Sequence, residues 1–199
     1  MKVYTKVELN EYKQSLTYDD ISLIPTEVSR IKSRTEASTN CSFLGLKLNV
    51  PVISSPMDSV TGIEMAKELS NLGSLGIVNR FDSSLDSVLN SKNGKGIKAI
   101  SIALNTNLNT IEKIVAKNYL ICIDTANANN KEVLRKTEII KKKFNVKVIV
   151  GNIAHGASLE QLENAGADAV RVGIGSGSVC TTSIQTGIGI GQVSSLLNI

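Results

Sequence analysis

Ala169-Val-Arg-Val172-Gly173-Ile-Gly175-Ser-Gly177-Ser-Val-Cys180-Thr-Thr182 is an apolar run that leads into alternating glycines and ends at a cysteine followed by two threonines. The valines at its start are typical of a strand. Glycines accept positive φ and let backbone N–H groups approach an anion, so the loop after the strand suits a phosphate. The N–H dipoles around Cys180 would favour its thiolate. The stretch predicts a strand followed by a phosphate-binding loop that carries a nucleophile.

The same loop has two simpler interpretations. A dinucleotide fingerprint, G-x-G-x-x-G, needs a glycine at its sixth position, where this sequence has Ser178 counted from Gly173 and Cys180 counted from Gly175. The spacing excludes that fingerprint. Alternatively, the cysteine is a small apolar residue in a flexible loop. The loop alone leaves this second interpretation open, because no base for the thiol lies nearby in the sequence.

Short apolar runs alternate with amphipathic stretches from residue 51 onward, which indicates β/α units around a parallel sheet. The predicted strands are Pro51–Ser54, Leu75–Val78, Ile97–Ile102, Leu120–Ile123, Val146–Val150 and Ala169–Val172. The predicted helices are Gly62–Leu72, Ser84–Ser91, Leu108–Lys117, Lys131–Phe144 and Ser158–Ala165. One unit repeats without the change of pattern typical of a doubly wound sheet. We therefore predict an α/β fold of the (β/α)8 TIM-barrel type.

Residues suited to chemistry follow these predicted strands. They are Met57 with Asp58, Asn79 with Arg80, Asp124, Asn152 and the Cys180 loop. In a β/α barrel the carboxyl ends of all strands open onto one face, where active sites form. Residues far apart in the sequence would thereby meet at one mouth.

The predicted barrel is incomplete. A full barrel has eight strands and typically about 250 residues, whereas this chain of 199 residues supplies six predicted strands. We expect residues 1–50 to form an extended N-terminal segment that packs on the barrel, and residues 51–199 to form the partial barrel. The first and last strands would then have unpaired edges. The chain is accordingly expected to be one piece of a split enzyme or a truncated sequence.

Composition narrows the class of protein. The net charge is +4, the lysines are dispersed, and the one dense run, Lys141 to Lys143, ends a predicted helix, where cations suit the dipole. Aromatic residues make up only 4% of the chain, so we expect no nucleic-acid partner. No apolar run approaches the roughly 18 residues of a membrane span, and no signal peptide is evident. Three scattered cysteines indicate a reducing compartment, and we expect a cytoplasmic protein.

Five segments follow one another along the chain in the order of the motifs of one known family. They are Leu16-Thr-Tyr-Asp-Asp20-Ile-Ser-Leu-Ile-Pro25, Pro51-Val-Ile-Ser-Ser55-Pro-Met57-Asp58-Ser-Val-Thr61, Gly151-Asn152, Ala165-Gly-Ala-Asp168, and the cysteine loop continued through Gly189. Together they resemble the motifs of the IMP dehydrogenase and GMP reductase family, from L-T-[FY]-D-D to G-x-G-S-[IV]-C-x-T. The resemblance covers the chain from Leu16 onward and favours the nucleophile over the inert cysteine. No regulatory module of the kind common in the dehydrogenases fits between Arg80 and the third strand.

The resemblance implies a purine-nucleotide oxidoreductase. Cys180 would attack C2 of a purine 5′-monophosphate, GMP or IMP, and NADP or NAD would carry the hydride. Thr182 would help to activate water or to protonate the leaving ammonia, together with a partner from the family's C-terminal part. The family's last two β/α units, with half of its phosphate site and its mobile flap, have no counterpart here. The chain is expected to form a homo-oligomer or to associate with a complementing C-terminal chain.

The remaining roles are implied residue by residue. Those that would contact the substrate are Ser55, Met57, Asn152, Gly177 and Ser178; those that would contact the cofactor are Asp124, Gly173 and Gly175. Backbone carbonyls of Gly175, Gly177 and Cys180 match a monovalent-cation site, which would hold K⁺ where a member depends on it. A core methionine is an equal alternative for Met57. His155, the single histidine, is expected at a surface turn, and Cys41 and Cys122 are expected to be packing residues.

The covalent step is shared by both activities, so weaker cues must choose between them. Asp124-Thr-Ala-Asn127, Ile63-Glu-Met-Ala-Lys67, Val179-Cys-Thr-Thr182 and the absent insert favour GMP reductase. The segments from Ser54 to Thr61 and from Leu16 to Asp20 favour IMP dehydrogenase. We expect the reductase slightly more than the dehydrogenase. A chain that only binds nucleotide or a partner, without turnover of its own, is the alternative of a different class.

Overall fold

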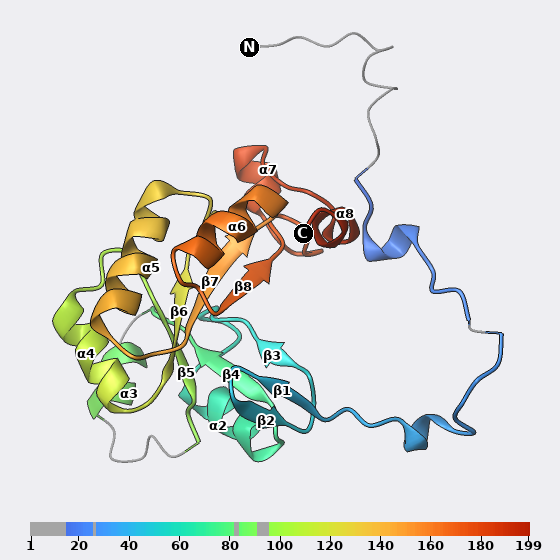
Figure 1. Ribbon diagram of the computed structural model, residues 1–199, viewed down its shortest axis with the longest axis horizontal. Coiled ribbons are helices and arrows are strands. Elements are labelled where there is room, and N and C mark those ends of the chain that lie inside the picture. The colour runs from blue at the N-terminus through green and yellow to red at the C-terminus, as the bar shows by residue number, and fades with distance from the viewer. Residues whose placement is uncertain (1–14, 26, 82–83, 91–95) are drawn as a thin grey trace, which may run out of the picture.

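The computed structural model describes residues 15–25, 27–81, 84–90 and 96–199 (Figure 1). Its first part holds two short 3₁₀ helices and a hairpin: η1 (Tyr18–Asp20), η2 (Arg34–Glu36), β1 (Cys41–Phe43) and β2 (Leu46–Leu48). Strands and helices then alternate: β3 (Ile53–Ser54), α2 (Ile63–Asn71), β4 (Leu75–Val78), α3 (Ser84–Asn90), β5 (Ala99–Ile102), α4 (Leu108–Ala116), β6 (Leu120–Asp124), α5 (Lys131–Lys143), β7 (Val148–Ile153), α6 (Gly156–Asn164), β8 (Ala169–Val172), α7 (Thr182–Thr186) and α8 (Gln192–Leu197).

The strands from β3 to β8 form one parallel sheet in the order of the chain. The sheet curls, and helices such as α4, α5 and α6 lie on its outer side (Figure 1). The predicted α/β fold with an incomplete TIM-type barrel is therefore confirmed. Among the described residues, β3 pairs only with β4 and β8 only with β7, so both outer edges of the sheet are open.

The two faces of the sheet bury separate clusters of apolar side chains. The outer cluster joins strand residues such as Ile100, Ile121 and Val150 to the helices, through Ile114 of α4 and Ile140 of α5. The inner cluster consists of Leu75, Ile77, Ala99, Leu120, Cys122 and Ile149, with Leu48 of the hairpin packed against them. The β1–β2 hairpin therefore fills the inner side of the sheet near the amino ends of its strands.

Local sequence explains the helix boundaries. Asn107 and Asn130 precede α4 and α5, and each side-chain oxygen accepts a backbone N–H of the first turn, at 2.8 Å in both cases. Lys141 to Lys143 form the last turn of α5, as predicted. All five predicted helices are present within about two residues of their expected ends; Ser91, predicted to end the second, lies outside the described residues.

The strand ends differ from the prediction at β7. This strand was expected to stop at Val150, so that Asn152 would follow it, but it runs to Ile153. Pairing of Ile153 with Val172 of β8 extends the strand beyond an irregularity in register. Asn152 is consequently held within a strand and not in the loop after it.

The N-terminal part contacts the rest of the chain at its two ends. The Leu16 N–H donates to Ser194 Oγ of α8 at 2.7 Å, and Leu48 of the hairpin is buried. Between these anchors Leu23 and Ile24 are 92% and 91% exposed. Cys41, predicted to pack inside, is exposed: it begins β1 of a two-stranded hairpin that joins no larger sheet of the described chain. Cys122 is buried, as predicted. The division at residue 50 stays a prediction.

Asp168, just before β8, is the centre of an ion-pair cluster at the amino ends of the strands. Its carboxylate accepts hydrogen bonds from Lys141 Nζ, Lys147 Nζ and the Val148 N–H, each at 2.8 Å. Burial alone would raise the pKa of this carboxyl, but these hydrogen bonds and the charge of Lys141 outweigh burial and lower the pKa. The ionised carboxylate therefore ties α5 and β7 to the start of β8.

Replacing Asp168 with Asn should lower the free energy of unfolding by about 1–3 kcal/mol at neutral pH, because it removes charge-assisted hydrogen bonds from a site only 13% exposed. The depressed pKa means that this stabilisation is present above the unfolded value, about 3.9, and is lost as pH falls toward the folded value. Urea unfolding at pH 7 and near pH 3 should show the difference between wild type and variant shrinking. A difference independent of pH would contradict the role of the charge.

Candidate active site at the carboxyl ends of the strands

A cavity of about 550 Å³ lies at the carboxyl ends of the strands. Among its lining residues are nine of the predicted site residues: Ser55, Met57, Asp124, Asn152, Gly173, Gly175, Gly177, Cys180 and Thr182. Ser178, predicted to bind phosphate, is exposed and does not line the cavity. Met57 is 49% exposed, which excludes the alternative of a core methionine. The topology therefore gathers residues separated by more than a hundred positions, as the barrel hypothesis required.

The loop after β8 turns sharply before Cys180. Gly173 and Gly175 have φ of +126° and +70°, which side-chain-bearing residues rarely adopt. A Cβ on Gly175 would stand 2.9 Å from the Ser183 Cβ, so the loop packs tightly against the segment that follows it. The Cys180 N–H donates to the Gly177 carbonyl at 2.9 Å and closes a turn. This turn holds Cys180 at the wall of the cavity.

The surroundings of Cys180 favour its ionised form. Hydrogen bonds from the side chain and then the backbone of Thr182, and a smaller one from the backbone of Gly175, lower the pKa of the thiol; the slight burial of the group opposes them. A lowered pKa raises the fraction of thiolate at neutral pH. The geometry thus supplies an accessible sulfur nucleophile with hydroxyl and N–H donors beside it.

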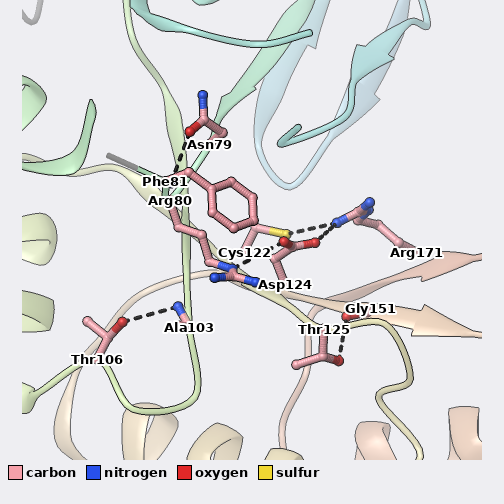
Figure 2. A network of polar contacts seen from close by, with 10 residues as sticks. All are labelled: Asn79, Arg80, Phe81, Ala103, Thr106, Cys122, Asp124, Thr125, Gly151 and Arg171. Carbon is pink, nitrogen blue, oxygen red and sulfur yellow. Dashed lines mark hydrogen bonds and ion pairs between the residues drawn. The ribbon is translucent and has the colours of Figure 1, made fainter. Parts of the chain in front are cut away.

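Asp124, the last residue of β6, carries two ion pairs (Figure 2). Its Oδ1 accepts Arg171 Nη1 at 2.7 Å, and its Oδ2 accepts Arg80 Nε at 3.3 Å. The Arg80 guanidinium also lies 4.3 Å from the centre of the Phe81 ring. Asp124 is 18% exposed and both arginines are less than a third exposed, so solvent screens these pairs only partly. Each carboxylate oxygen keeps a second lone pair for a ligand hydroxyl.

Arg171 is a site residue that sequence reasoning missed. It lies on the inner side of β8, where its guanidinium also contacts Cys122 Sγ at 3.9 Å. Gly151 is its partner across the β7–β8 pair, and a Cβ there would stand 2.5 Å from the Arg171 Cβ. Only glycine leaves room for the arginine. The available signal was a single cation inside an apolar strand, because such a charge needs a partner.

Gln192 of α8 was also missed, and it braces the cysteine loop. Its Oε1 accepts the Ser176 hydroxyl at 2.7 Å, and its Nε2 donates to the Val172 carbonyl at 3.0 Å. Asn152 likewise donates from Nδ2 to the Gly173 carbonyl at 2.7 Å. The amide side chains of Asn152, from β7, and Gln192, from α8, therefore both fix the start of the loop. No local pattern signals such long-range amide bonds.

Buried Thr61 and Asn79 position the loop that carries Ser55 and Met57. The Thr61 hydroxyl lies 2.6 Å from the Ser55 carbonyl and 2.8 Å from Ser54 Oγ. Asn79 Nδ2 donates to the Thr61 carbonyl at 3.0 Å. The β3–α2 loop is thus tied to the end of β4, which keeps Ser55 at the cavity.

His155 lies outside this cavity, at the exposed start of α6, as predicted for a surface turn. Within the described part of the chain, no group of three or more His, Cys, Asp or Glu side chains could hold a metal ion. The helices there are also too short or too polar to cross a bilayer.

A curled sheet of β/α units with its polar site at the carboxyl ends of the strands defines an α/β protein of the TIM-barrel class. The domain model described as "IMP dehydrogenase / GMP reductase domain" matches residues 15–199, and the chain belongs to this family. It is 36% identical to the GMP reductase of Lysinibacillus sphaericus, over 87% of this chain and 55% of the relative.

Two further relatives show the same partial coverage. The GMP reductase of Streptococcus gordonii is 36% identical, over 94% of this chain and 59% of the relative. The inosine-5′-monophosphate dehydrogenase of Cryptosporidium parvum is 30% identical, over 92% and 57%. The chain thus spans little more than half the length of the curated relatives that it matches. Both activities of the family are represented among them.

Proposed function

We propose that this chain provides the nucleophile and much of the nucleotide site of a purine-nucleotide oxidoreductase, with GMP as substrate and IMP and ammonia as products. The observation that carries the proposal is Cys180, a thiol of lowered pKa at the wall of the cavity that Asp124 and Asn152 also line. The preference for the reductase is supported by relatives: the GMP reductases reach 36% identity and the dehydrogenase 30%.

In the proposed reaction the Cys180 thiolate forms a bond to C2 of the purine. The C2–N bond of the exocyclic amine breaks, and the amine takes up one proton and leaves as ammonia. The hydroxyl of Thr182, which contributes to lowering the pKa of the thiol, is proposed to pass on that proton. A hydride then adds to C2 while the C–S bond breaks, which regenerates the thiolate. One hydride and one proton convert GMP into IMP and ammonia.

When bound, the reduced cofactor, NADPH or NADH, would supply the hydride. Asp124 fits the ribose of the cofactor as a hydrogen-bond acceptor. It faces the cavity, and each of its carboxylate oxygens has a lone pair that the arginines do not use. Arg80 and Arg171 hold that carboxylate in one orientation. Gly173 and Gly175 are proposed to contact the cofactor through their backbone. K⁺ at the carbonyls of Gly175, Gly177 and Cys180 stays a prediction, and Gly177 already accepts the Cys180 N–H.

Alkylation by iodoacetamide tests the nucleophile. Cys180 should react with a pH midpoint below the ordinary thiol value of about 8.5, and saturating GMP should slow its labelling by about tenfold or more. Exposed Cys41 is the matched control and should not be protected by GMP. Cys122 should stay unlabelled until the chain unfolds, because burial raises the pKa of its thiol to about 11. Equal effects of GMP on Cys41 and Cys180 would refute the proposal.

IMP dehydrogenase is the second candidate, and the Ser54–Thr61 segment favours it. That segment resembles the dehydrogenase motif and supplies Ser55, Met57 and Asp58 to the cavity. Parallel assays separate the two activities: oxidation of NAD(P)H with GMP, and reduction of NAD(P) with IMP. Binding of nucleotide with neither activity in the completed assembly would support the third alternative, a chain that only binds.

We further propose that the working enzyme contains two more β/α units, on this or another polypeptide. The open edges of β3 and β8 each offer unpaired backbone groups that a parallel strand would satisfy. The exposed Leu23 and Ile24 of the N-terminal segment offer apolar surface for the same element. Thr182 also needs a partner group, since a hydroxyl alone is a poor acid or base.

A further inference from the structure

A second and smaller pocket lies beside the cysteine loop. Its volume is about 240 Å³, and its walls come from the loops after β6 and β7 and from residues 188–190. Ile174 lines this pocket and also the Cys180 cavity. The two spaces therefore share one wall, yet none of the predicted site residues lies in the second one.

The polar wall of the second pocket presents hydrogen-bond donors. His155 Nδ1 accepts the Ala157 N–H at 3.2 Å, so the proton of the neutral ring sits on Nε2. Asn127 Oδ1 accepts the Asn129 N–H at 3.0 Å, which leaves the NH₂ group of Asn127 available. The pocket also lies at the positive end of α6. No described carboxylate lines it.

Ser158 adds a further donor to the wall of the pocket. It lines the pocket and is only 2% exposed, and its hydroxyl has no hydrogen-bond partner in the described part of the chain. Its oxygen is not one of the fully buried, unpartnered atoms of the described chain, so it is open to the pocket and can donate to a ligand there. An acceptor oxygen placed in the pocket would satisfy it.

The rest of the wall is apolar. Ile174, Ile188 and Ile190 contribute branched side chains opposite the donors. A donor-rich end without carboxylates, next to an apolar end, suits a phosphate group carried on a small apolar body. We propose that this pocket binds a small phosphate ester at the start of α6. The site is separate from the proposed catalytic function and does not depend on it.

A ligand in the second pocket would stabilise the cysteine loop. The Ile190 N–H donates to the Ile174 carbonyl at 3.1 Å, so residues 188–190 are hydrogen-bonded to the first turn of the loop. A ligand against Ile174 and Ile190 would hold both segments together. The pocket is thereby placed to stabilise the loop without touching Cys180.

Phenyl phosphate is a suitable probe, read out on the full chain by hydrogen–deuterium exchange of peptides covering residues 154–160. Wild type should show saturable protection there. His155→Asp keeps an acceptor that caps α6 but brings a negative charge to the pocket, and should weaken the response by about tenfold or more. Asn130→Asp makes a matching change at the cap of α5, outside the pocket, and should leave the response intact.

Ser158→Val covers the case in which the histidine variant does not fold, and should weaken protection by about tenfold through loss of the hydroxyl. Inorganic phosphate should protect less than phenyl phosphate, because it leaves the isoleucine wall unused. Equal protection by the two probes would overturn the assignment to an ester. Unchanged exchange of residues 154–160 with phenyl phosphate, or an equal response in wild type, His155→Asp and Ser158→Val, would overturn the site.

Discussion

Turnover of GMP with NAD(P)H should rise by on the order of 10³-fold or more when the 199-residue chain is supplied with a polypeptide carrying two further β/α units. The isolated chain holds Cys180 and Asp124, but the Cys180 thiol is the one described acid or base shown to interact with the Thr182 side chain. A nucleophile that forms its adduct without a positioned acid or base gains only part of the catalysis. We therefore expect the isolated chain to bind nucleotide with negligible turnover.

Adding the polypeptide with two β/α units should also reduce self-association of the chain. Open edges at β3 and β8 and the exposed apolar side chains of the N-terminal segment favour self-association of the isolated chain. Co-expression followed by size-exclusion chromatography and a coupled absorbance assay measures both effects. A two-unit polypeptide from an unrelated β/α barrel is the control. A well-behaved monomer that turns over GMP by itself would contradict the proposal of two additional units.

Replacing Cys180 with Ser should abolish turnover in the completed assembly, with a loss of about 10⁴-fold or more. The serine hydroxyl stays protonated at neutral pH, where the lowered pKa of the cysteine yields a thiolate. The adduct at purine C2 should vanish from intact-mass spectra at the same time, while GMP still binds. Cys41→Ser is the matched control, because Cys41 is exposed and remote from the cavity. A Cys180→Ser enzyme with more than about one hundredth of wild-type turnover would exclude covalent catalysis by this residue.

The β/α part of the fold was predictable from the sequence because the central strands β4 to β7 are buried and mostly apolar. β4 and β8 begin and end at the predicted residues, and β6 is longer by one residue, Asp124. The hairpin of β1 and β2 was not predicted. Its strands have three residues each, too few to show a period, and they are held by pairing with each other and by contact with the inner cluster. The short helices α7 and α8 escaped prediction for the same reason.

The candidate site was predictable where a residue with a reactive or charged side chain lies at or after the end of a predicted strand. Asp124 and Cys180 could be placed at one mouth because parallel strands share a direction. Arg171 could not, since its role depends on which face of β8 points inward and on the space left by Gly151 across the pair. Gln192 depends on the placement of α8, which three-dimensional packing decides. Side chains that fix a site from a distance leave little local trace in a sequence.

The anchoring of the N-terminal segment to α8 affects the order of events during synthesis. Ser15 Oγ accepts the Gly191 N–H and Leu16 N–H donates to Ser194 Oγ, contacts that span 176 and 178 positions. Neither can form until α8 has left the ribosome, so the segment around Leu16 stays without these partners until α8 is made. Gln192 begins that same helix and braces the cysteine loop. The cysteine loop is therefore braced only after β8 and α8 have both been made, later than the β/α units that precede them in the chain.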